Sequence, residues 1–373
     1  MAAVTSLDFA ALRRYPDLEA DNLFAVDASD RLILDVAKVD ENARLAVLND
    51  NYGALTLGAA SQGVTGIRVY QDALTGERAL GFNAEAESLE GAYDNLPLTP
   101  ALLEGATVVL MQLPKSLDEL DDFARAIAAW ASPDVTVYAG GRIKHMTTSM
   151  NDVFLRYFEQ VDVSLARQKS RVLTVTKPKP DVAPPAPREE IHSDIGLTIA
   201  ASGGAFAGTK LDIGTRVLLK VLPKAAPSAA SAIDLGCGTG VLAAALAVAR
   251  PGIRVIASDQ SAAAVASALR TMELNGVSDR VSVVRDDGLQ SQPDASADLI
   301  VLNPPFHVGA VVHTGIALGL FEDAARVLKP GGELWVVFNS HLGYRQALAR
   351  IVGPTDLVTH TDKFMVTVSK RNR

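Results

Sequence analysis

Short apolar runs alternate with longer alanine-rich stretches along the second half of the chain. Each run is almost continuously apolar, as is typical of strands that are buried on both faces of a sheet. The predicted strands span residues 230–235, 254–258, 281–285, 299–302, 333–339 and 364–369, and the predicted helices span about 240–250, 261–275 and 315–328. This alternation predicts an α/β domain with a doubly wound, mostly parallel sheet.

The first half repeats this plan more faintly. Residues 47–55 align with 234–242, which pairs Gly53 with Gly240. Residues 109–115 align with 300–306 at a nearly equal offset, as small insertions would produce. We therefore predict two tandem Rossmann-like domains that arose by duplication. Chance alignment of two generic strand–turn–helix units is the alternative.

The first half lacks the polar residues and glycines that the second half carries at the aligned positions. Val47, Asn49, Asn51 and Gln112 stand there for Asp234, Gly236, Gly238 and Asn303. An asparagine side chain in place of glycine disfavours the close approach of a ligand to the backbone. We therefore predict that the N-terminal domain is degenerate and catalytically silent.

A proline-rich segment joins the two halves. Residues 177–187 contain five prolines, and such a run favours an extended chain over helix or sheet. We predict an N-terminal domain at 1–176, a linker at 177–190 and a C-terminal domain at 191–373. An irregular surface loop within a single domain is the alternative.

A glycine-rich loop follows the strand predicted at 230–235. Its glycines, Gly236, Gly238 and Gly240, stand at alternate positions, which lets the backbone turn sharply and approach a ligand closely. The G-x-G-x-G spacing differs from the G-x-G-x-x-G of dinucleotide-binding proteins. A nicotinamide oxidoreductase is therefore disfavoured.

Carboxylates stand at the ends of three predicted strands. Asp234 ends the first strand, where a buried carboxylate needs partners from the loop or a ligand. Asp259 ends the second and can accept hydrogen bonds from both hydroxyls of a ribose. Asp286 and Asp287 end the third, where a carboxylate can accept from an adenine amine. A helix cap or a turn is the alternative for Asp259, and a turn is the alternative for Asp286 and Asp287.

The segment after the fourth predicted strand, Asn303-Pro304-Pro305-Phe306, is the most specific in the chain. Two prolines cannot extend a strand ladder, so they fix a rigid loop at the carboxyl end of the sheet. The aromatic ring can stack on a planar substrate. The Asn303 amide oxygen and the Pro304 carbonyl can each accept one N–H of an exocyclic amine, and methylation then gains mainly from proximity and alignment.

This order of motifs resembles the Rossmann-like methyltransferases that use S-adenosylmethionine. The segment 303–307 is similar to that of the bacterial ribosomal RNA guanine-N2 methyltransferases, as are 206–216, 339–344 and 363–368. Residues 328–333 resemble the turn before the fifth strand of the wider class. In the first half, 48–55 and 113–116 resemble the degenerate domain of the large-subunit (23S) enzymes. The resemblance implies catalytic roles for Asn303, Pro304, Pro305 and Phe306. It implies cofactor binding by Phe206, Asp212, Asp234, Gly236, Cys237, Gly238, Gly240, Asp259, Gln260, Asp286 and Asp287.

The resemblance also implies the reaction, which is methylation of the N2 amine of a guanine in ribosomal RNA of the large-subunit (23S) type. The partner is then ribosomal RNA or a precursor of a ribosomal subunit. Methylation of a protein glutamine amide or of DNA adenine by the same segment stays open. A non-catalytic RNA-binding or assembly factor is the alternative from another class, although the intact second-half motifs disfavour it.

Candidate RNA contacts lie in both halves. His307 follows the Asn-Pro-Pro-Phe segment, and a basic run that includes Arg167, Lys169 and Arg171 ends the first half. A solvated face is the alternative explanation of that run. We expect the first domain to dock RNA while the target guanine is unstacked into the Asn303 pocket.

The bulk composition excludes several other classes. The chain has 48% hydrophobic residues, 21% charged residues and a net charge of −8, so wholesale electrostatic adhesion to nucleic acid or to an anionic membrane is disfavoured. Its single cysteine, Cys237, rules out an intrachain disulfide and, without a histidine cluster, predicts no metal site. No apolar run reaches the roughly 20 residues that a membrane span requires, and no secretory signal begins the chain. We expect a cytoplasmic, monomeric protein.

Overall fold

The computed structural model describes residues 7–304 and 310–372, with the backbone alone at 310–314. The chain divides into two compact units, Met1–Ala186 and Pro187–Arg373. Between strand β7 (Ser170–Pro178) and strand β8 (Arg188–His192), residues 179–187 form neither helix nor strand. This interval contains most of the prolines that predicted a linker.

The first unit contains a seven-stranded sheet in the order β3-β2-β1-β4-β5-β7-β6. Its first five strands in sequence pair in parallel, and β7 runs antiparallel to both of its neighbours. Besides β7, the strands are β1 (Leu45–Leu48), β2 (Ile67–Tyr70), β3 (Tyr93–Asn95), β4 (Val108–Gln112), β5 (Thr136–Arg142) and β6 (Phe158–Val163). The helices are α1 (Ala28–Ala37), α2 (Ala54–Ala60), α3 (Leu74–Ala86), α4 (Pro100–Leu103), α5 (Leu117–Trp130) and α6 (Thr148–Tyr157).

The second unit repeats this topology, with the strand order β12-β11-β10-β13-β14-β16-β15. Its strands are β10 (Ser231–Leu235), β11 (Arg254–Asp259), β12 (Val281–Arg285), β13 (Ala297–Leu302), β14 (Leu328–Asn339), β15 (Thr355–His360) and β16 (Phe364–Lys370). Its helices are α7 (Ile213–Val221), α8 (Val241–Ala249), α9 (Ala262–Leu274), α10 (Ala310–Val327) and α11 (Tyr344–Ile351). Strand for strand, the two orders are identical, so the predicted pair of tandem Rossmann-like folds is confirmed.

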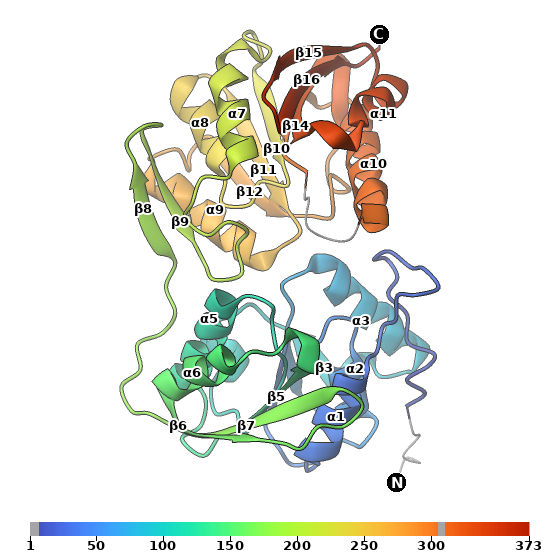
Figure 1. Cartoon of the computed structure of the whole chain (residues 1–373), viewed down its shortest axis with the longest axis vertical. Helices are drawn as coiled ribbons and strands as arrows, with labels where there is room; N and C mark the ends of the chain where they lie inside the picture. The colour runs from blue at the N-terminus through green and yellow to red at the C-terminus, as the bar shows by residue number, and fades with distance from the viewer. Residues whose placement is uncertain (1–6, 305–309, 373) are drawn as a thin grey trace. The chain divides into compact units, whose positions relative to one another are not determined.

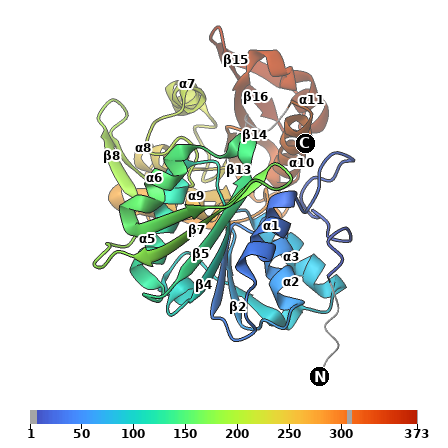
Figure 2. The same ribbon diagram turned by 60° about the horizontal axis from the view of Figure 1, so that its bottom comes forward.

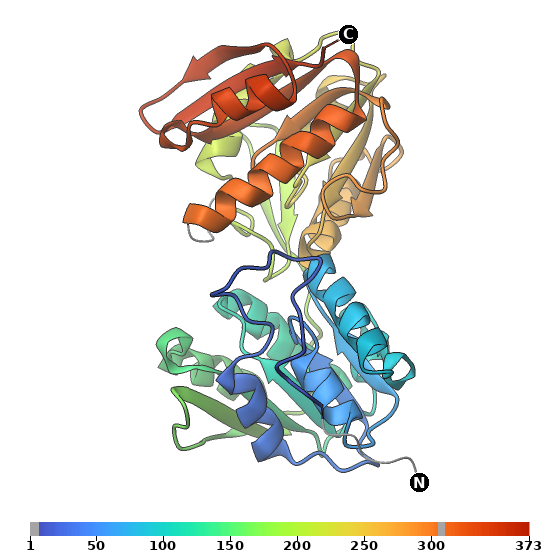
Figure 3. The same cartoon turned by 90° about the vertical axis from the view of Figure 1, so that its right-hand side faces the viewer.

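Each sheet is covered by helices on both faces. In the second unit one face packs against α7, α8 and α9, and the other packs against α10 and α11 (Figure 1). Figure 3 shows α10 crossing its face of the sheet, where Phe321 is fully buried. In the first unit α1, α2 and α3 cover one face, and α5 and α6 cover the other (Figure 2). Burial on both faces explains why the central strands are continuously apolar.

Several elements of the second unit were not predicted, among them the helices α7 and α11. The edge strand β15 has mixed exposure and carries Thr, Asp and His among its residues, so no apolar run marks it. A separate two-stranded hairpin, β8 with β9 (Leu197–Ala201), precedes α7 and packs against α9. Strand β14 also begins earlier than predicted, because Leu328 pairs with Ala297 across an irregularity in register. No helix in the described part of the chain is both long and apolar enough to cross a membrane.

Candidate active site

The predicted glycine loop joins β10 to α8 at the carboxyl edge of the second sheet. Gly236, Gly238 and Gly240 all have positive φ angles, of 66°, 53° and 78°. A Cβ added to Gly240 would lie 2.7 Å from Met272 Cε, so this glycine is required by packing against α9. A Cβ on Gly236 or Gly238 would meet no atom within 4 Å. These two glycines therefore present backbone to open space.

Asp234 lies beneath this loop at the end of β10 and is almost fully buried. Its Oδ2 atom accepts a hydrogen bond of 2.9 Å from the backbone amide of Ala243 in α8. Its Oδ1 atom is buried and has no partner among the described residues. Burial, with a smaller contribution from the nearby Asp259 carboxylate, raises the pKa of Asp234 to about 7. A buried carboxylate oxygen without a donor favours a ligand that supplies one.

Asp259 ends β11 and holds the glycine loop in place. Its two oxygens accept from the backbone amides of Gly238 and Ser261, each at 2.9 Å. Ser261 in turn caps the N-terminus of α9 through the amide of Ala264. The carboxylate predicted to bind ribose therefore also links the glycine loop to the start of α9.

The carboxylates after β12 differ from each other. Asp286 is buried, and its Oδ2 atom accepts from the amide and the hydroxyl of Ser291 at 2.9 and 2.7 Å, which closes the turn that follows. Asp287 is less buried and accepts from Gln290 at 3.2 Å. Gln260 lies nearby on the neighbouring strand end, where its carbonyl accepts from Arg285. A turn-closing role, the alternative given above, describes Asp286 better than Asp287.

The remaining predicted cofactor residues lie around the same edge. Cys237 is buried within the glycine loop, and burial raises the pKa of its thiol, so it is a packed and unreactive group. Phe206 is 57% exposed in the turns that follow β9. Asp212 caps the N-terminus of α7 by accepting from the amide of Thr215. No cluster of ligating residues suited to a metal ion occurs among the described residues.

Asn303 follows β13 and faces the start of α7. Its Nδ2 atom donates to Asp212 Oδ2 and to Thr215 Oγ1, each at 3.0 Å. Its Oδ1 atom is buried and has no partner among the described residues. Pro304 is also buried. The other predicted members of this segment, Pro305, Phe306 and His307, lie outside the described residues.

The basic residues predicted to contact RNA lie in the first unit. Arg167 and Lys169 are exposed in the turn between β6 and β7, and Arg171 is exposed in β7 itself. Arg167 forms an ion pair of 2.7 Å with Asp35 in α1, and both side chains are more than half exposed. Strand β5 ends beside this turn, where the Ile143 amide donates to the Lys169 carbonyl.

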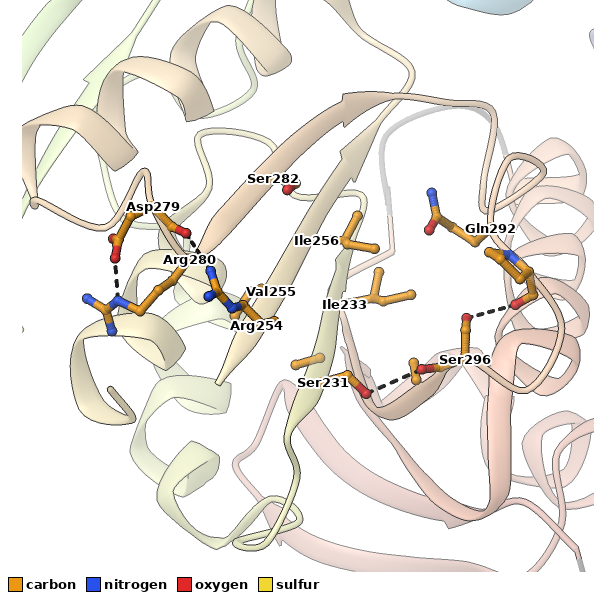
Figure 4. A pocket seen from close by; sticks show the side chains of 13 residues that line it. Ser231, Ile233, Arg254, Val255, Ile256, Asp279, Arg280, Ser282, Gln292 and Ser296 are labelled. Carbon is orange, nitrogen blue, oxygen red and sulfur yellow. Dashed lines mark hydrogen bonds and ion pairs between the residues drawn. The ribbon is translucent and has the colours of Figure 1, made fainter. Parts of the chain in front are cut away.

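A cavity of about 240 Å³ opens at the opposite edge of the second sheet, at the amino ends of β10 to β13 (Figure 4). Ile233 and Ile256 point into it from adjacent strands, and Gln292 and Ser296 lie across from them. In the first unit the short helix α4 fills the connection between β3 and β4, whereas the second unit has only a loop there. The cavity therefore reflects a missing helix and is separate from the carboxyl edge that carries the polar residues described above.

Comparison with known proteins assigns both units. The RLMG N-terminal domain model matches residues 2–179, and the methyltransferase small domain model matches residues 196–368. The ribosomal RNA large subunit methyltransferase G of Streptomyces avermitilis is 34% identical over 367 residues, which is 95% of each chain. The enzyme of the same name from Pseudomonas putida is 32% identical, over 96% of this chain and 97% of that one.

The chain belongs to the ribosomal RNA large subunit methyltransferase G family. The family resemblance predicted from the motifs is thus confirmed. A solved structure, the T. thermophilus 16S rRNA N2 methyltransferase in complex with AdoMet and guanosine, aligns with a TM-score of 0.75. The alignment covers 93% of this chain and 92% of that chain at 22% identity, so it shows a common fold across both units.

The two units differ at the carboxyl edge of their sheets. In the first unit, side chains stand at the positions that correspond to the open glycine loop of the second unit. Asn49 and Asn51 adopt the same left-handed conformation as Gly236 and Gly238, with φ angles of 60° and 63°. The Asn49 side chain donates to the carbonyl of Gln112 at 3.0 Å, which joins the loop after β1 to the end of β4. Side chains thus stand here where the second unit presents bare glycine backbone. The geometry therefore agrees with the predicted degeneracy of the N-terminal domain.

Sequence reasoning missed one residue of the site, Thr215. Its hydroxyl accepts from Asn303, but the two residues are far apart in sequence and meet only because α7 starts beside the end of β13. The helix-capping pattern of Asp212, with its capped amide three residues later, predicts the helix start but not what the start faces.

Proposed function

We propose that this protein transfers a methyl group from S-adenosylmethionine to the exocyclic N2 amine of a guanine in ribosomal RNA, of the large-subunit (23S) type. The observation that carries the proposal is the Asn303 amide, whose buried Oδ1 atom has no donor among the described residues and lies at the edge of the sheet where ligands bind in this fold. The names of the relatives support the RNA substrate, and the guanosine in the T. thermophilus complex supports the base.

The residues present fit the cofactor. Gly236 and Gly238 leave room for a ligand against the backbone, and Asp234 Oδ1 has no donor of its own within the described chain. We assign the methionine part of the cofactor to this loop, the ribose hydroxyls to Asp259 and the adenine to Asp287. When bound, S-adenosylmethionine supplies an electrophilic methyl group attached to a sulfonium.

Asn303 and Pro304 orient the nucleophile. The lone pair of an aromatic amine is delocalised into the ring, so the nitrogen attacks poorly unless it is held. Asn303 Oδ1 accepts one N–H of the amine, and the Pro304 carbonyl accepts the other. Both acceptors directly follow the end of β13, and the Asn303 amide is bonded to the start of α7, so methylation gains from alignment without a strong base. The surplus proton leaves after the attack. Phe306, by its place in the motif, stacks on the base.

The first unit is assigned to RNA docking. Arg167, Lys169 and Arg171 present positive charge on one exposed turn and strand of an otherwise acidic protein. The Arg167–Asp35 pair is exposed and therefore contributes little to stability, so a phosphate can compete for that guanidinium. Contacts to phosphates position a nucleic acid without reading its sequence.

The test of methylation is the transfer of labelled methyl groups to protein-free ribosomal RNA and to ribosomal subunits. Label that digests to N2-methylguanosine, and that disappears in Asn303→Ala, is the expected result. Gln112→Ala makes the same change at the equivalent position of the first unit and should retain the label. Label found only in protein or in adenine would show that the substrate is not guanine. Cofactor binding without any transfer would indicate a binding factor.

The test of docking is RNA affinity as a function of salt. The pair Lys169→Glu and Arg171→Glu should weaken binding and reduce its salt dependence. A matched pair of reversals in the second unit, Lys220→Glu and Lys224→Glu, changes the net charge equally on two exposed residues, the first in the last turn of α7 and the second just after that helix. An equal loss of RNA affinity in both double variants would mean that RNA binding depends on net charge alone and not on the basic turn.

A further inference from the structure

The amide of Asn303 is held from one side only. Its Nδ2 atom donates to a carboxylate oxygen of Asp212 and to the hydroxyl of Thr215, both at 3.0 Å. Its Oδ1 atom accepts from no described residue although it is buried. An amide has one donor end and one acceptor end, and the two can exchange by rotation about one bond. The groups around Nδ2 therefore decide which end faces the substrate.

Asp212 is the group that fixes this choice. A carboxylate accepts hydrogen bonds and cannot donate when ionised, so it tolerates the NH₂ end of an amide and repels the carbonyl end. Its Oδ2 atom also accepts from the Thr215 amide at 3.1 Å, which anchors the carboxylate as the N-cap of α7. Thr215 Oγ1, one helical turn into α7, completes the second bond to Nδ2.

Close packing holds the three side chains together. A Cβ added to Gly214 would lie 3.0 Å from Asp212 Oδ2 and 3.3 Å from Asn303 Oδ1. These distances are shorter than ordinary van der Waals contacts of carbon. A side chain at 214 would press on both groups, so the glycine lets the first turn of α7 lie close to the end of β13.

The first unit also has an amide at the end of a strand that is bonded to the start of a helix. Gln112, at the end of β4, donates from Nε2 to Ser29 Oγ at 3.0 Å and to Asp30 in the first turn of α1. There a hydroxyl also lies beside the carbonyl end: Gln112 Oε1 is 3.2 Å from Ser29 Oγ, whose single proton Asp27 Oδ1 can accept as well. Both units thus keep a hydrogen bond from the amide at the strand end to the start of the helix. Among the described residues, the amide oxygen lies beside a hydroxyl in the first unit and has no donor in the second.

We propose that Asp212 and Thr215 are positioning residues that lock Asn303 with its carbonyl toward the amine to be methylated. This inference rests on the proposed function of Asn303 and gives Asp212 a role other than the cofactor contact expected from its sequence context. With the amide reversed, its NH₂ group would face the N–H of the substrate amine, and two donors would oppose each other. The lock therefore acts on the alignment of the nucleophile and not on the affinity for the cofactor.

The first experiment separates these two effects. Thr215→Val removes one acceptor and keeps the side-chain shape, whereas Thr215→Ser keeps the hydroxyl. Asp212→Ser keeps a good N-cap but withdraws the carboxylate from Asn303. We expect Thr215→Val and Asp212→Ser to lower kcat roughly 10- to 100-fold, with the Kd for S-adenosylmethionine within about twofold of wild type. Thr215→Ser should restore most of kcat. Loss of cofactor affinity with unchanged kcat would overturn the inference.

A helix-cap control excludes a general loss of stability. Ser116 belongs to the first unit, where it caps α5 by accepting from the amide of Glu119. Ser116→Ala should therefore lower thermal stability as a lost cap does and leave kcat unchanged. If it lowers kcat as much as Asp212→Ser, the effect of the latter is structural.

A reciprocal exchange tests the direction of the bond. Asn303→Asp places two carboxylates against each other and should abolish most activity. Combining it with Asp212→Asn restores the hydrogen bond in the opposite direction, because the amide at 212 can donate to the carboxylate at 303. The second oxygen of that carboxylate still faces the amine. The double variant should recover activity relative to Asn303→Asp alone, on the order of tenfold or more. A double variant no more active than the single one would overturn the inference.

A spectroscopic readout needs no substrate and so distinguishes failure of the inference from failure of the proposed function. With asparagine labelled in ¹⁵N, the side-chain NH₂ signals of Asn303 are those that vanish in Asn303→Ala. They should exchange slowly with solvent in the wild type and faster in Asp212→Ser. Equal exchange would show that the lock does not exist, whereas slow exchange in a protein that labels no RNA would overturn the RNA substrate alone.

Discussion

Asp50 and Asp234 accept a hydrogen bond from the same position of their respective folds, although the two carboxylates are not aligned. Asp234 Oδ2 binds the amide of Ala243 at 2.9 Å, and Asp50 Oδ2 binds the amide of Thr56, the aligned residue of α2, at 2.8 Å. Asp50 reaches this amide from the loop after β1, whereas Asp234 reaches it from the strand end. The equivalent backbone amide at the start of the helix therefore finds a carboxylate acceptor in both units, but from different positions in the chain.

The difference lies in the second oxygen of each carboxylate. Asp50 Oδ1 accepts from the Leu55 amide at 2.7 Å, so both oxygens are bonded within the first unit. Asp234 Oδ1 has no donor among the described residues. The first unit has therefore completed its glycine-loop equivalent internally, and the second requires an external donor to complete its own.

Replacing Asp50 should cost stability without affecting the cofactor. Asp50→Ala leaves two buried amides at the start of α2 without acceptors, at a cost of about 2–3 kcal/mol. Hydrogen exchange of residues 54–60 should accelerate strongly. Asp50→Asn keeps one acceptor, so its loss of stability should be about half that of Asp50→Ala. The Kd for S-adenosylmethionine should stay within about twofold of wild type, and a larger change would show that the first unit supports the cofactor site.

Cofactor affinity should rise with pH through neutrality. Burial and the neighbouring Asp259 carboxylate raise the pKa of Asp234 to about 7, so the ionised form is scarce at pH 6 and predominant at pH 8. A ligand that carries positive charge binds the ionised form better, so the affinity should increase roughly tenfold over this range. Isothermal titration at each pH measures it. In Asp234→Asn the affinity should be low at every pH; an unchanged pH dependence there would assign the titration to another group.

Filling the open space over the glycine loop should reduce affinity more than stability. Gly236→Ala and Gly238→Ala each add a methyl group toward the proposed cofactor position and strain a positive φ at about 1 kcal/mol. We expect the cofactor Kd to rise by roughly tenfold or more, as measured by titration. The matched control is Gly276→Ala, at a φ of 64° with nothing within 4 Å of its added Cβ. Gly276→Ala should lower the thermal stability by a similar amount and leave the cofactor Kd unchanged.

The amino edge of the second sheet should lose stability in acid. Asp298 accepts from Lys329 Nζ at 2.7 Å and from Ser231 Oγ at 2.9 Å. Although burial opposes the shift, these bonds lower the pKa of Asp298 to about 2 from its ordinary value of 3.8. A lowered pKa in the folded state stabilises the protein above about pH 4, and that contribution is lost as the pH falls to about 2.

Asp298→Asn tests this contribution. The variant should be less stable than wild type by about 1–2 kcal/mol at pH 7. The two proteins should converge as the pH falls from 4 to 2, as followed by urea unfolding. A constant difference across that range would mean that the carboxylate contributes by packing and not by its charge.

Much of the site followed from sequence because its residues lie at the ends of strands. A continuously apolar run followed by Asp234 or Asn303 predicts both the strand and the edge at which its last residue emerges, because the carboxyl ends of parallel strands share one edge. Asp286 shows the limit of that inference. Its place after β12 is as predicted, yet its Oδ2 atom accepts from the amide and hydroxyl of Ser291, which come later in the same turn.

The sequence by itself determined the alternation of strands and helices, the duplication of one α/β plan, and the motifs that mark the second unit as the methyltransferase domain. Only the tertiary structure decided which atoms of those motifs are already bonded. Asn303 meets Asp212 and Thr215, and Asn49 meets Gln112, across long stretches of chain. Local patterns encode where a strand ends, whereas the orientation of an amide depends on the donors and acceptors that packing places around it.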